Sequence, residues 1–201
     1  MNFVEIPAWN DMLVLPPVND GNAASADRSP YEVSLLSFVR RFATTPARCT
    51  ILRGLLEFRQ SIHEAGITAG FQWVDGSFVE DVEARYGRGP RDLDVVTFVL
   101  SHESGDPQQI PPNLLDLERL KSSFAVDNYW VQSRNERALV KATTYWYSMW
   151  SHRRDRQWKG YVQLDLDAEF DSASMTELRK VETRLRESTC DDVSNHHEES
   201  Q

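Results

Sequence analysis

The chain has 201 residues, a hydrophobic content of 40% and a formal net charge of −9 at pH 7. This length suits one domain with a buried core. Because there is neither an apolar run of about 20 residues nor a basic and then apolar N-terminus, we expect a cytoplasmic protein with no membrane partner. The acidic charge disfavours long duplex nucleic acid, which rewards clustered Lys and Arg. Two cysteines form neither a disulfide framework nor a zinc pattern.

The N-terminal part of the chain predicts an extended arm and then two helices. Residues 1–30 are rich in Pro, Asn, Asp and Ser, so we expect little regular structure there. Ser29 followed by proline is a helix start signal, and Thr45 followed by proline repeats it. The second helix should end before Gly66, since glycine readily adopts the left-handed conformation that terminates helices.

The central stretch predicts a strand, a glycine turn, a short helix, a loop and a second strand. Residues 67–74 suit the first strand, and residues 78–86 suit the short helix. Residues 87–91 form the loop because of their glycines and proline. Residues 92–100, DLDVVTFVL, are the most strongly β-forming run in the chain.

Four further segments complete the chain. We expect a short helix around 114–124. Residues 136–150 are ambiguous between strand and helix, and their apolar spacing favours helix. Residues 160–167 alternate as a strand does. A last helix then precedes a polar, flexible tail at 190–201.

Two carboxylates stand at the start of the second central strand. Asp92 and Asp94 are two positions apart, so they project from one face. Mg²⁺ prefers oxygen ligands and often keeps some of its coordination positions for substrate phosphates. The pair therefore indicates a metal site, although the same pattern also occurs where a strand simply begins at a solvated turn.

The first central strand ends in a Gly-Ser turn. A strand followed by Gly76, Ser77 and a helix lets backbone N–H groups approach phosphate oxygens. The dipeptide alone is a common turn. Together with the Asp-x-Asp strand, it predicts a phosphate cradle that faces metal-binding carboxylates.

These two motifs together resemble the polymerase-beta-like nucleotidyltransferase superfamily. Its members carry a hydrophobic residue, Gly and then Gly or Ser, followed by a helix and an alternating pair of acidic residues. The matching segments here are VDGS at 74–77 and DLDV at 92–95. Asp75 replaces the usual hydrophobic residue, and the spacer of fourteen residues is long. The phrases GFQWVDGSFVED, PRDLDVVTF and SHRRDRQWKG are also similar to an uncharacterised bacterial family of small proteins of this kind.

The resemblance implies an α/β fold with a short mixed sheet flanked by helices, here over residues 31–189. It implies an enzyme that transfers a nucleotide from an NTP or dNTP such as ATP, with Mg²⁺ or Mn²⁺ as cofactor and pyrophosphate as product. The acceptor would be a hydroxyl of protein, RNA or a growing oligonucleotide. Compact bacterial members serve antiphage or toxin–antitoxin modules, so a cognate protein partner is a further expectation.

Members of the superfamily place a third carboxylate on a later neighbouring strand. Asp165 and Asp167 are the candidates in the 160–167 strand. Asp165 is preferred because it lies in mid-strand between hydrophobic neighbours, where it would complete the metal site and act as general base. Both residues also fit exposed strand positions.

Other side chains fit the same chemistry less specifically. Lys159 and Arg153 or Arg154 would neutralise a triphosphate, or belong to a solvated basic loop in which Asp155 pairs with arginine. The aromatic residues at 145–147 and 150 would stack a base or form core. As an alternative to an enzyme, the fold would serve as a nucleotide- or partner-binding module, such as an antitoxin or regulatory subunit.

Overall fold

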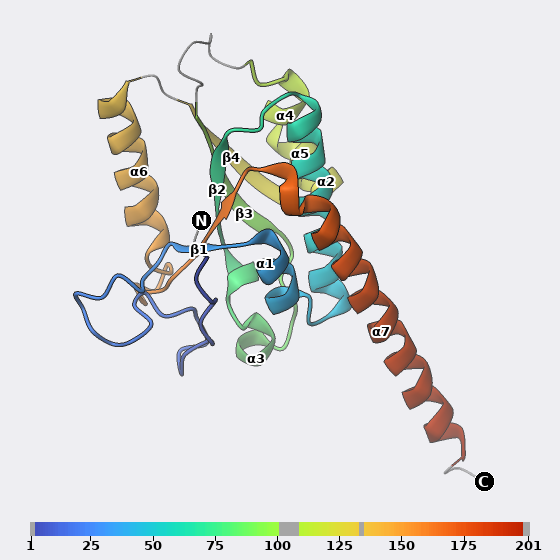
Figure 1. The fold of residues 1–201 in the computed structure, drawn as a ribbon. Helices are drawn as coiled ribbons and strands as arrows, with labels where there is room; N and C mark the ends of the chain where they lie inside the picture. The colour runs from blue at the N-terminus through green and yellow to red at the C-terminus, as the bar shows by residue number, and fades with distance from the viewer. Residues whose placement is uncertain (1–2, 101–108, 133–134, 199–201) are drawn as a thin grey trace.

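The computed structural model describes residues 3–100, 109–132 and 135–198. Within them, a five-stranded mixed sheet of order β1-β5-β2-β3-β4 is flanked by seven α-helices (Figure 1). The expected mixed α/β class is therefore confirmed. The elements in chain order are β1 (Tyr31–Val33), α1 (Leu35–Phe42), α2 (Pro46–Glu64), β2 (Gly70–Asp75), the 3₁₀ turn η1 (Ser77–Val79), α3 (Val82–Tyr86), β3 (Leu93–Val99), α4 (Pro112–Leu115), α5 (Leu117–Phe124), β4 (Val126–Gln132), α6 (Glu136–Trp150), β5 (Val162–Asp165), the 3₁₀ turn η2 (Ala168–Phe170) and α7 (Asp171–Glu198).

Strand β2 lies at the centre of the sheet and runs antiparallel to both neighbours, β3 and β5. The outer pairs, β3 with β4 and β1 with β5, are parallel. The parallel β3–β4 pair is joined by α4 and α5, which is the crossover that parallel neighbours need. As a consequence, β3 and β4 begin at the same edge of the sheet.

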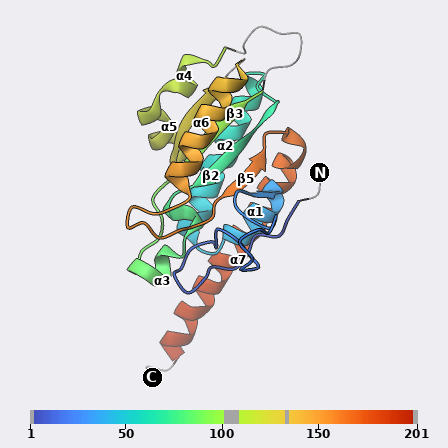
Figure 2. The ribbon, with the colours of Figure 1, turned by 90° about the vertical axis from the view of Figure 1, so that its left-hand side faces the viewer.

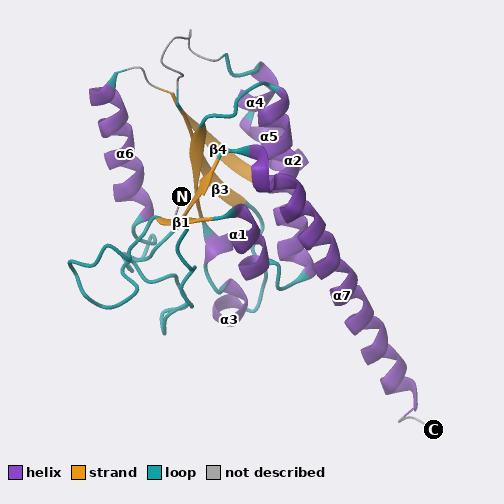
Figure 3. Ribbon diagram, in the orientation of Figure 1, coloured by secondary structure: helices purple, strands orange, loops and turns teal. Residues whose placement is uncertain are grey.

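The two faces of the sheet are covered unequally. Helices α1, α2 and α7 pack on one face over the larger hydrophobic core, which includes Val74, Val95 and Leu164 (Figure 3). Among the described helices, only α6 covers the opposite face, where Trp73 and Phe98 belong to a second core (Figure 2). Since side chains alternate along a strand, each strand contributes to both cores. The α6 face therefore has less helical cover.

The expected helix from Thr45 to before Gly66 is confirmed as α2. The Thr45 hydroxyl accepts a hydrogen bond from the Arg48 N–H, and Gly66 adopts a φ of 77°. The helix start expected at Ser29 is wrong, because residues 31–33 form β1 and α1 is capped by Ser34. Buried Tyr31 and Val33 alternate with exposed Glu32, and the backbone of this segment pairs with β5 instead of forming a helix.

Strands were expected near β2, β3 and β5, and a helix at α6, and all four are confirmed. Strand β4 occupies a segment for which local sequence patterns predict no element. Helix α7 continues to Glu198, so residues 190–198 are helical where a flexible tail was expected. None of the described segments forms a helix with the length and apolar character needed to cross a membrane.

The N-terminal arm has little regular structure, as expected, but it packs against the body. Its residues Val14 and Leu15 are fully buried. The Trp9 indole donates a hydrogen bond to the Val79 carbonyl at 2.8 Å, and the Gly160 N–H donates to the Leu15 carbonyl at 2.7 Å. The arm therefore holds the η1 turn and the segment before β5 together.

A buried polar network crosses the larger core beneath three strands. The Arg59 guanidinium donates to Gln72 at 2.8 Å, Gln72 donates to Thr97 at 3.1 Å, and Thr97 donates to Asn128 at 2.6 Å. All four side chains are fully buried. Because a slip of one residue would leave these groups unpaired, the network fixes the register of β2, β3 and β4.

Candidate functional site

Carboxylates gather where β3 and β4 begin, on the face that α6 covers. In the strand register Asp94 lies beside Asp75 on one side and beside Asp127 on the other. Asp92 lies just before β3 and repels the Asp94 carboxylate. The side chains of Asp92 and Asp127 are 26% and 23% exposed, so a ligand can reach them. We refer to Asp92, Asp94 and Asp127 as the carboxylate cluster.

The Gly-Ser turn meets this cluster directly. Gly76 has a φ of 83°, and a Cβ atom at this position would lie 2.1 Å from Oδ2 of Asp94. Only glycine therefore allows the turn to approach the carboxylate this closely. Ser77 follows at the start of η1. The structure thus brings the Gly76 turn against Asp94, beside Asp92, as the motifs predicted.

The structure does not bring Asp165 to the carboxylate cluster, so the predicted three-carboxylate arrangement with this residue is wrong. Strand β5 is antiparallel to β2, and Asp165 pairs with Phe71, whereas Asp94 pairs with Asp75. Four strand positions separate the two levels, which corresponds to about 13 Å. Asp167 lies beyond the end of β5, still further from the cluster.

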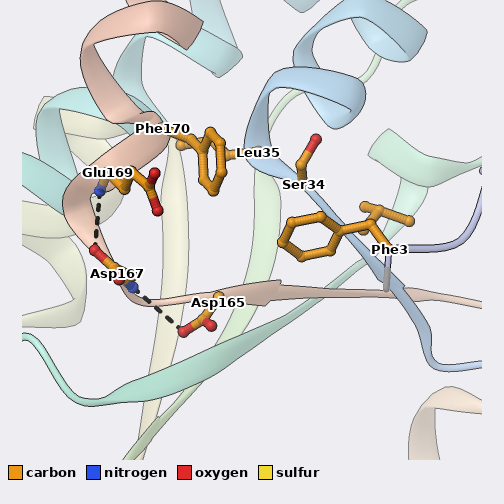
Figure 4. Close-up of a pocket in the computed structure, with 8 residues that line it drawn as sticks. Phe3, Ser34, Leu35, Asp165, Asp167, Glu169 and Phe170 are labelled. Carbon is orange, nitrogen blue, oxygen red and sulfur yellow. Dashed lines mark hydrogen bonds between the residues drawn. The ribbon is translucent and has the colours of Figure 1, made fainter. Parts of the chain in front are cut away.

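Asp165 instead lines a separate cavity of about 210 Å³ (Figure 4). Its Oδ1 accepts a hydrogen bond from the Asp167 N–H at 3.3 Å, and Asp167 accepts one from the Glu169 N–H at 3.0 Å. Phe3 and Phe170 contribute aromatic rings to the same cavity. These acidic side chains therefore serve local turns at the opposite end of β5.

The third carboxylate near the Asp-x-Asp pair is Asp127. It is not among the site residues that the sequence predicts, because local patterns predict no element for its segment. The available signal was a hydrophobic residue followed by Asp at the start of two strands, Leu93-Asp94 and Val126-Asp127. Parallel strands joined by a crossover begin at the same edge, so these two aspartates lie side by side.

A lysine ammonium lies between two members of the carboxylate cluster. Lys121 Nζ is 2.7 Å from Oδ2 of Asp92 and 3.6 Å from Oδ2 of Asp127. The Asp92 carboxylate raises the pKa of Lys121, which is 54% exposed. In the described residues, no three His, Cys, Asp or Glu side chains are already arranged around one point as metal ligands. Lys121 thus supplies the positive charge between the carboxylates.

The carboxylates nearest the Gly-Ser turn are held in an environment that favours protonation. Burial, reinforced by the negative charges of Asp92 and Asp127, raises the pKa of Asp94 to about 6. Burial also raises the pKa of Asp75 to about 6, although the Lys159 charge opposes this. A bound cation would offset the repulsion around Asp94.

The two cations expected to bind a triphosphate are engaged in ion pairs within the protein. Lys159 is only 4% exposed, and its Nζ lies 2.9 Å from Asp75 Oδ1 and 3.0 Å from Glu80 Oε1. Arg153 contacts Asp155 at 3.1 Å and Glu80 at 3.7 Å. The alternative of an arginine paired with Asp155 is confirmed, while Lys159 is buried beneath the turn and not solvated.

The raised pKa of Asp94 predicts that Asp94→Asn stabilises the metal-free protein at neutral pH. The folded state binds a proton on Asp94 more tightly than the unfolded state does, so this group reduces stability as pH rises from about 4 to 6. The variant should gain about 1–2 kcal/mol in the free energy of unfolding at pH 7 and little at pH 4. Urea unfolding in EDTA at both pH values measures the difference.

A stability difference between Asp94→Asn and wild type that is the same at pH 7 and pH 4 would contradict the raised pKa of Asp94. Asp165→Asn provides the control, because Asp165 is a strand carboxylate outside the cluster.

Comparison with known proteins places the chain by its family. A family model described as a family of unknown function (DUF6932) matches residues 7–165, which include all five strands and the carboxylate cluster. No curated protein and no solved structure matches the chain. Because the match spans most of its length, the chain belongs to the DUF6932 family.

Proposed function

We propose that this protein is a metal-dependent nucleotidyltransferase with a polymerase-beta-like fold. The observation that carries the proposal is the contact of the Gly76 turn with Asp94, beside Asp92 and Asp127. A turn that admits phosphate oxygens and a cluster of oxygen ligands are the two components that nucleotidyl transfer needs. The buried network beneath the strands keeps these components in register.

The donor atoms of the cluster suit a hard cation. Asp92, Asp94 and Asp127 offer only carboxylate oxygens, which Mg²⁺ and Mn²⁺ prefer, and these three residues would hold the metal. Bound there, the metal would neutralise phosphate charge and lower the pKa of a coordinated hydroxyl.

The chain's own residues have distinct roles in this proposal. Gly76 lets the backbone approach the phosphates of the donor NTP or dNTP, and the Ser77 hydroxyl donates a hydrogen bond to them. Asp127, partly exposed at the edge of the cluster, accepts the proton of the attacking hydroxyl. The hydroxyl oxygen then bonds to the α-phosphorus as the bond to pyrophosphate breaks.

The acceptor is a hydroxyl of protein, RNA or a growing oligonucleotide. The net charge of −9 argues against extended duplexes as acceptors, because it would repel their phosphates. A role in bacterial defence or a toxin–antitoxin pair, with a cognate protein partner in the cytoplasm, belongs to the same proposal.

A transfer assay tests the proposal. The purified protein is incubated with each NTP and dNTP labelled on the α-phosphate, with Mg²⁺ or Mn²⁺, and with or without total RNA. Label in protein, RNA or an oligomer with the intact protein, but not with the Asp92→Ala, Asp94→Ala variant, is the expected result. Absence of transfer under every condition, with nucleotide binding that survives both substitutions, would reject it.

The position of Lys121 favours a second candidate function, a nucleotide- or partner-binding module without turnover. Its ammonium already offsets part of the negative charge of Asp92 and Asp127, at the place where a metal would. If this ion pair is permanent, the protein needs no metal and catalyses no transfer. If Lys121 is displaced when a metal binds, the enzyme proposal stands.

Lys121→Met separates the two candidates. For an enzyme, removing this competing and half-exposed ammonium should tighten Mn²⁺ binding about fivefold, since an exposed ion pair contributes up to about 1 kcal/mol. Isothermal titration with Mn²⁺ measures the change. Lys180→Met, on an exposed lysine of α7, is the matched control. A variant that binds no Mn²⁺ and is less stable than wild type would favour the binding module.

A further inference from the structure

Three aromatic side chains lie on the same sheet face as the carboxylate cluster. Tyr129 comes from β4, two residues after Asp127, so the two positions are about 7 Å apart along the strand. The ring centroids of Tyr129 and Trp146 are 4.8 Å apart, and those of Tyr145 and Trp146 are 5.2 Å apart. We refer to Tyr129, Tyr145 and Trp146 as the aromatic patch.

Packing of α6 against the sheet does not require all of these rings. Leu139, Ala142, Trp146 and Trp150 already fill the space between the helix and the strands. Tyr145 is nevertheless 60% exposed, and Tyr129 is 37% exposed. The patch therefore presents aromatic surface to solvent at the edge of the second core. Within it, the Trp146 ring contacts both tyrosine rings.

The patch and the carboxylate cluster lie next to each other on this face of the sheet. Asp127 and Tyr129 are two positions apart on β4, so their side chains project from the same face. In the strand register Asp127 lies beside Asp94, which contacts the Gly76 turn. A ligand held by its phosphates at Gly76 and the carboxylates can extend from there over the rings.

We propose that the aromatic patch stacks the base of the nucleotide whose phosphates bind at the carboxylate cluster. This inference rests on the proposed function and adds the part of the site that binds the base. A planar, uncharged ring is the group that matches tyrosine and tryptophan faces beside a negatively charged cluster. Stacking tolerates every base, so the patch favours purines by area without selecting one by hydrogen bonding.

Comparing ATP with inorganic tripolyphosphate tests the inference, because only ATP carries a base. Both are titrated into the full-length protein with Mn²⁺ by calorimetry. Tyr145→Ala should raise the Kd for ATP about tenfold, and the Kd for tripolyphosphate should not change. Tyr145→Phe, which keeps the ring, and Val140→Ala, at a 64% exposed position of the same helix, should bind both ligands as wild type does.

The outcomes separate this inference from the proposed function. If wild type binds ATP and Tyr145→Ala binds it equally well, the base lies elsewhere and only the inference fails. If Tyr145→Ala changes the oligomeric state while its ATP affinity is unchanged, the patch is a protein contact and the inference again fails. If wild type with Mn²⁺ binds neither ligand, the proposed function fails and the inference fails with it.

Discussion

Asp127→Asn is expected to reduce nucleotidyl transfer by about 10³-fold or more, whereas Asp165→Asn should leave the rate within about twofold of wild type. Both substitutions remove one carboxylate charge from a strand. Asp127 lies beside Asp94 and shares the ammonium of Lys121 with Asp92. Asp165 lies four strand positions away from that level. Initial rates with saturating Mn²⁺ and labelled NTP measure both effects.

The stabilities of the two variants decide how the rates are interpreted. Neither side chain belongs to the buried network, so thermal unfolding should change little in either variant. A folded Asp127→Asn protein without activity would support the role proposed for this residue. The reverse pattern, with activity lost only in Asp165→Asn, would contradict the carboxylate cluster and return the third position to β5.

Much of the fold follows from local patterns in the sequence. Thr45 and Pro46 cap α2, and the helix ends before Gly66, since each residue type has a backbone preference that does not depend on distant contacts. The run Leu93–Val99 forms β3 because its residues are buried on both faces. Such elements can be predicted from one sequence. The strand β1 could not, because a helix start signal before it competes with pairing to β5.

The third carboxylate shows what local patterns cannot provide. Both Asp127 and Asp165 occupy alternating strands, and the sequence does not state which strand is paired with which. The antiparallel pairing of β5 with β2 places Asp165 four strand positions from the level of Asp94. The parallel pairing of β4 with β3 places Asp127 beside Asp94. Pairing depends on long-range packing, so it emerges only from the folded chain.

The buried ion pair of Lys159 and Asp75 likewise depends on contacts between distant parts of the chain. The sequence shows Lys159 in a basic segment and Asp75 in place of a hydrophobic residue, but it shows no relation between them. In the structure each accounts for the other, because Lys159 Nζ lies 2.9 Å from Asp75 Oδ1. The contact is an ion pair whose angles do not meet those of a regular hydrogen bond. The unusual residue before Gly76 is therefore one half of a buried ion pair.

Lys159→Met should destabilise the protein by about 3–5 kcal/mol, as expected when one partner of a buried ion pair is removed. Burial alone would lower the pKa of Lys159, but Asp75 and Glu80 outweigh it and raise the pKa. Without the ammonium, Asp75 remains buried with no cation beside it and must lose its charge or draw in water, while Glu80 keeps only its 3.7 Å contact with Arg153. Urea unfolding at pH 7 measures the loss. Lys180→Met, with a 66% exposed side chain, should cost less than about 0.5 kcal/mol.

The same variant decides whether Lys159 positions the turn or binds phosphate. Asp75 directly precedes Gly76, so a disturbed ion pair moves the turn as well as the core. Adding Asp75→Asn and Glu80→Gln to Lys159→Met also removes the two carboxylate charges that Lys159 contacts. The triple variant should regain part of the lost stability, because no buried carboxylate is then left without its lysine partner. A Lys159→Met protein of wild-type stability that fails to bind tripolyphosphate would overturn this account and assign the lysine to the ligand.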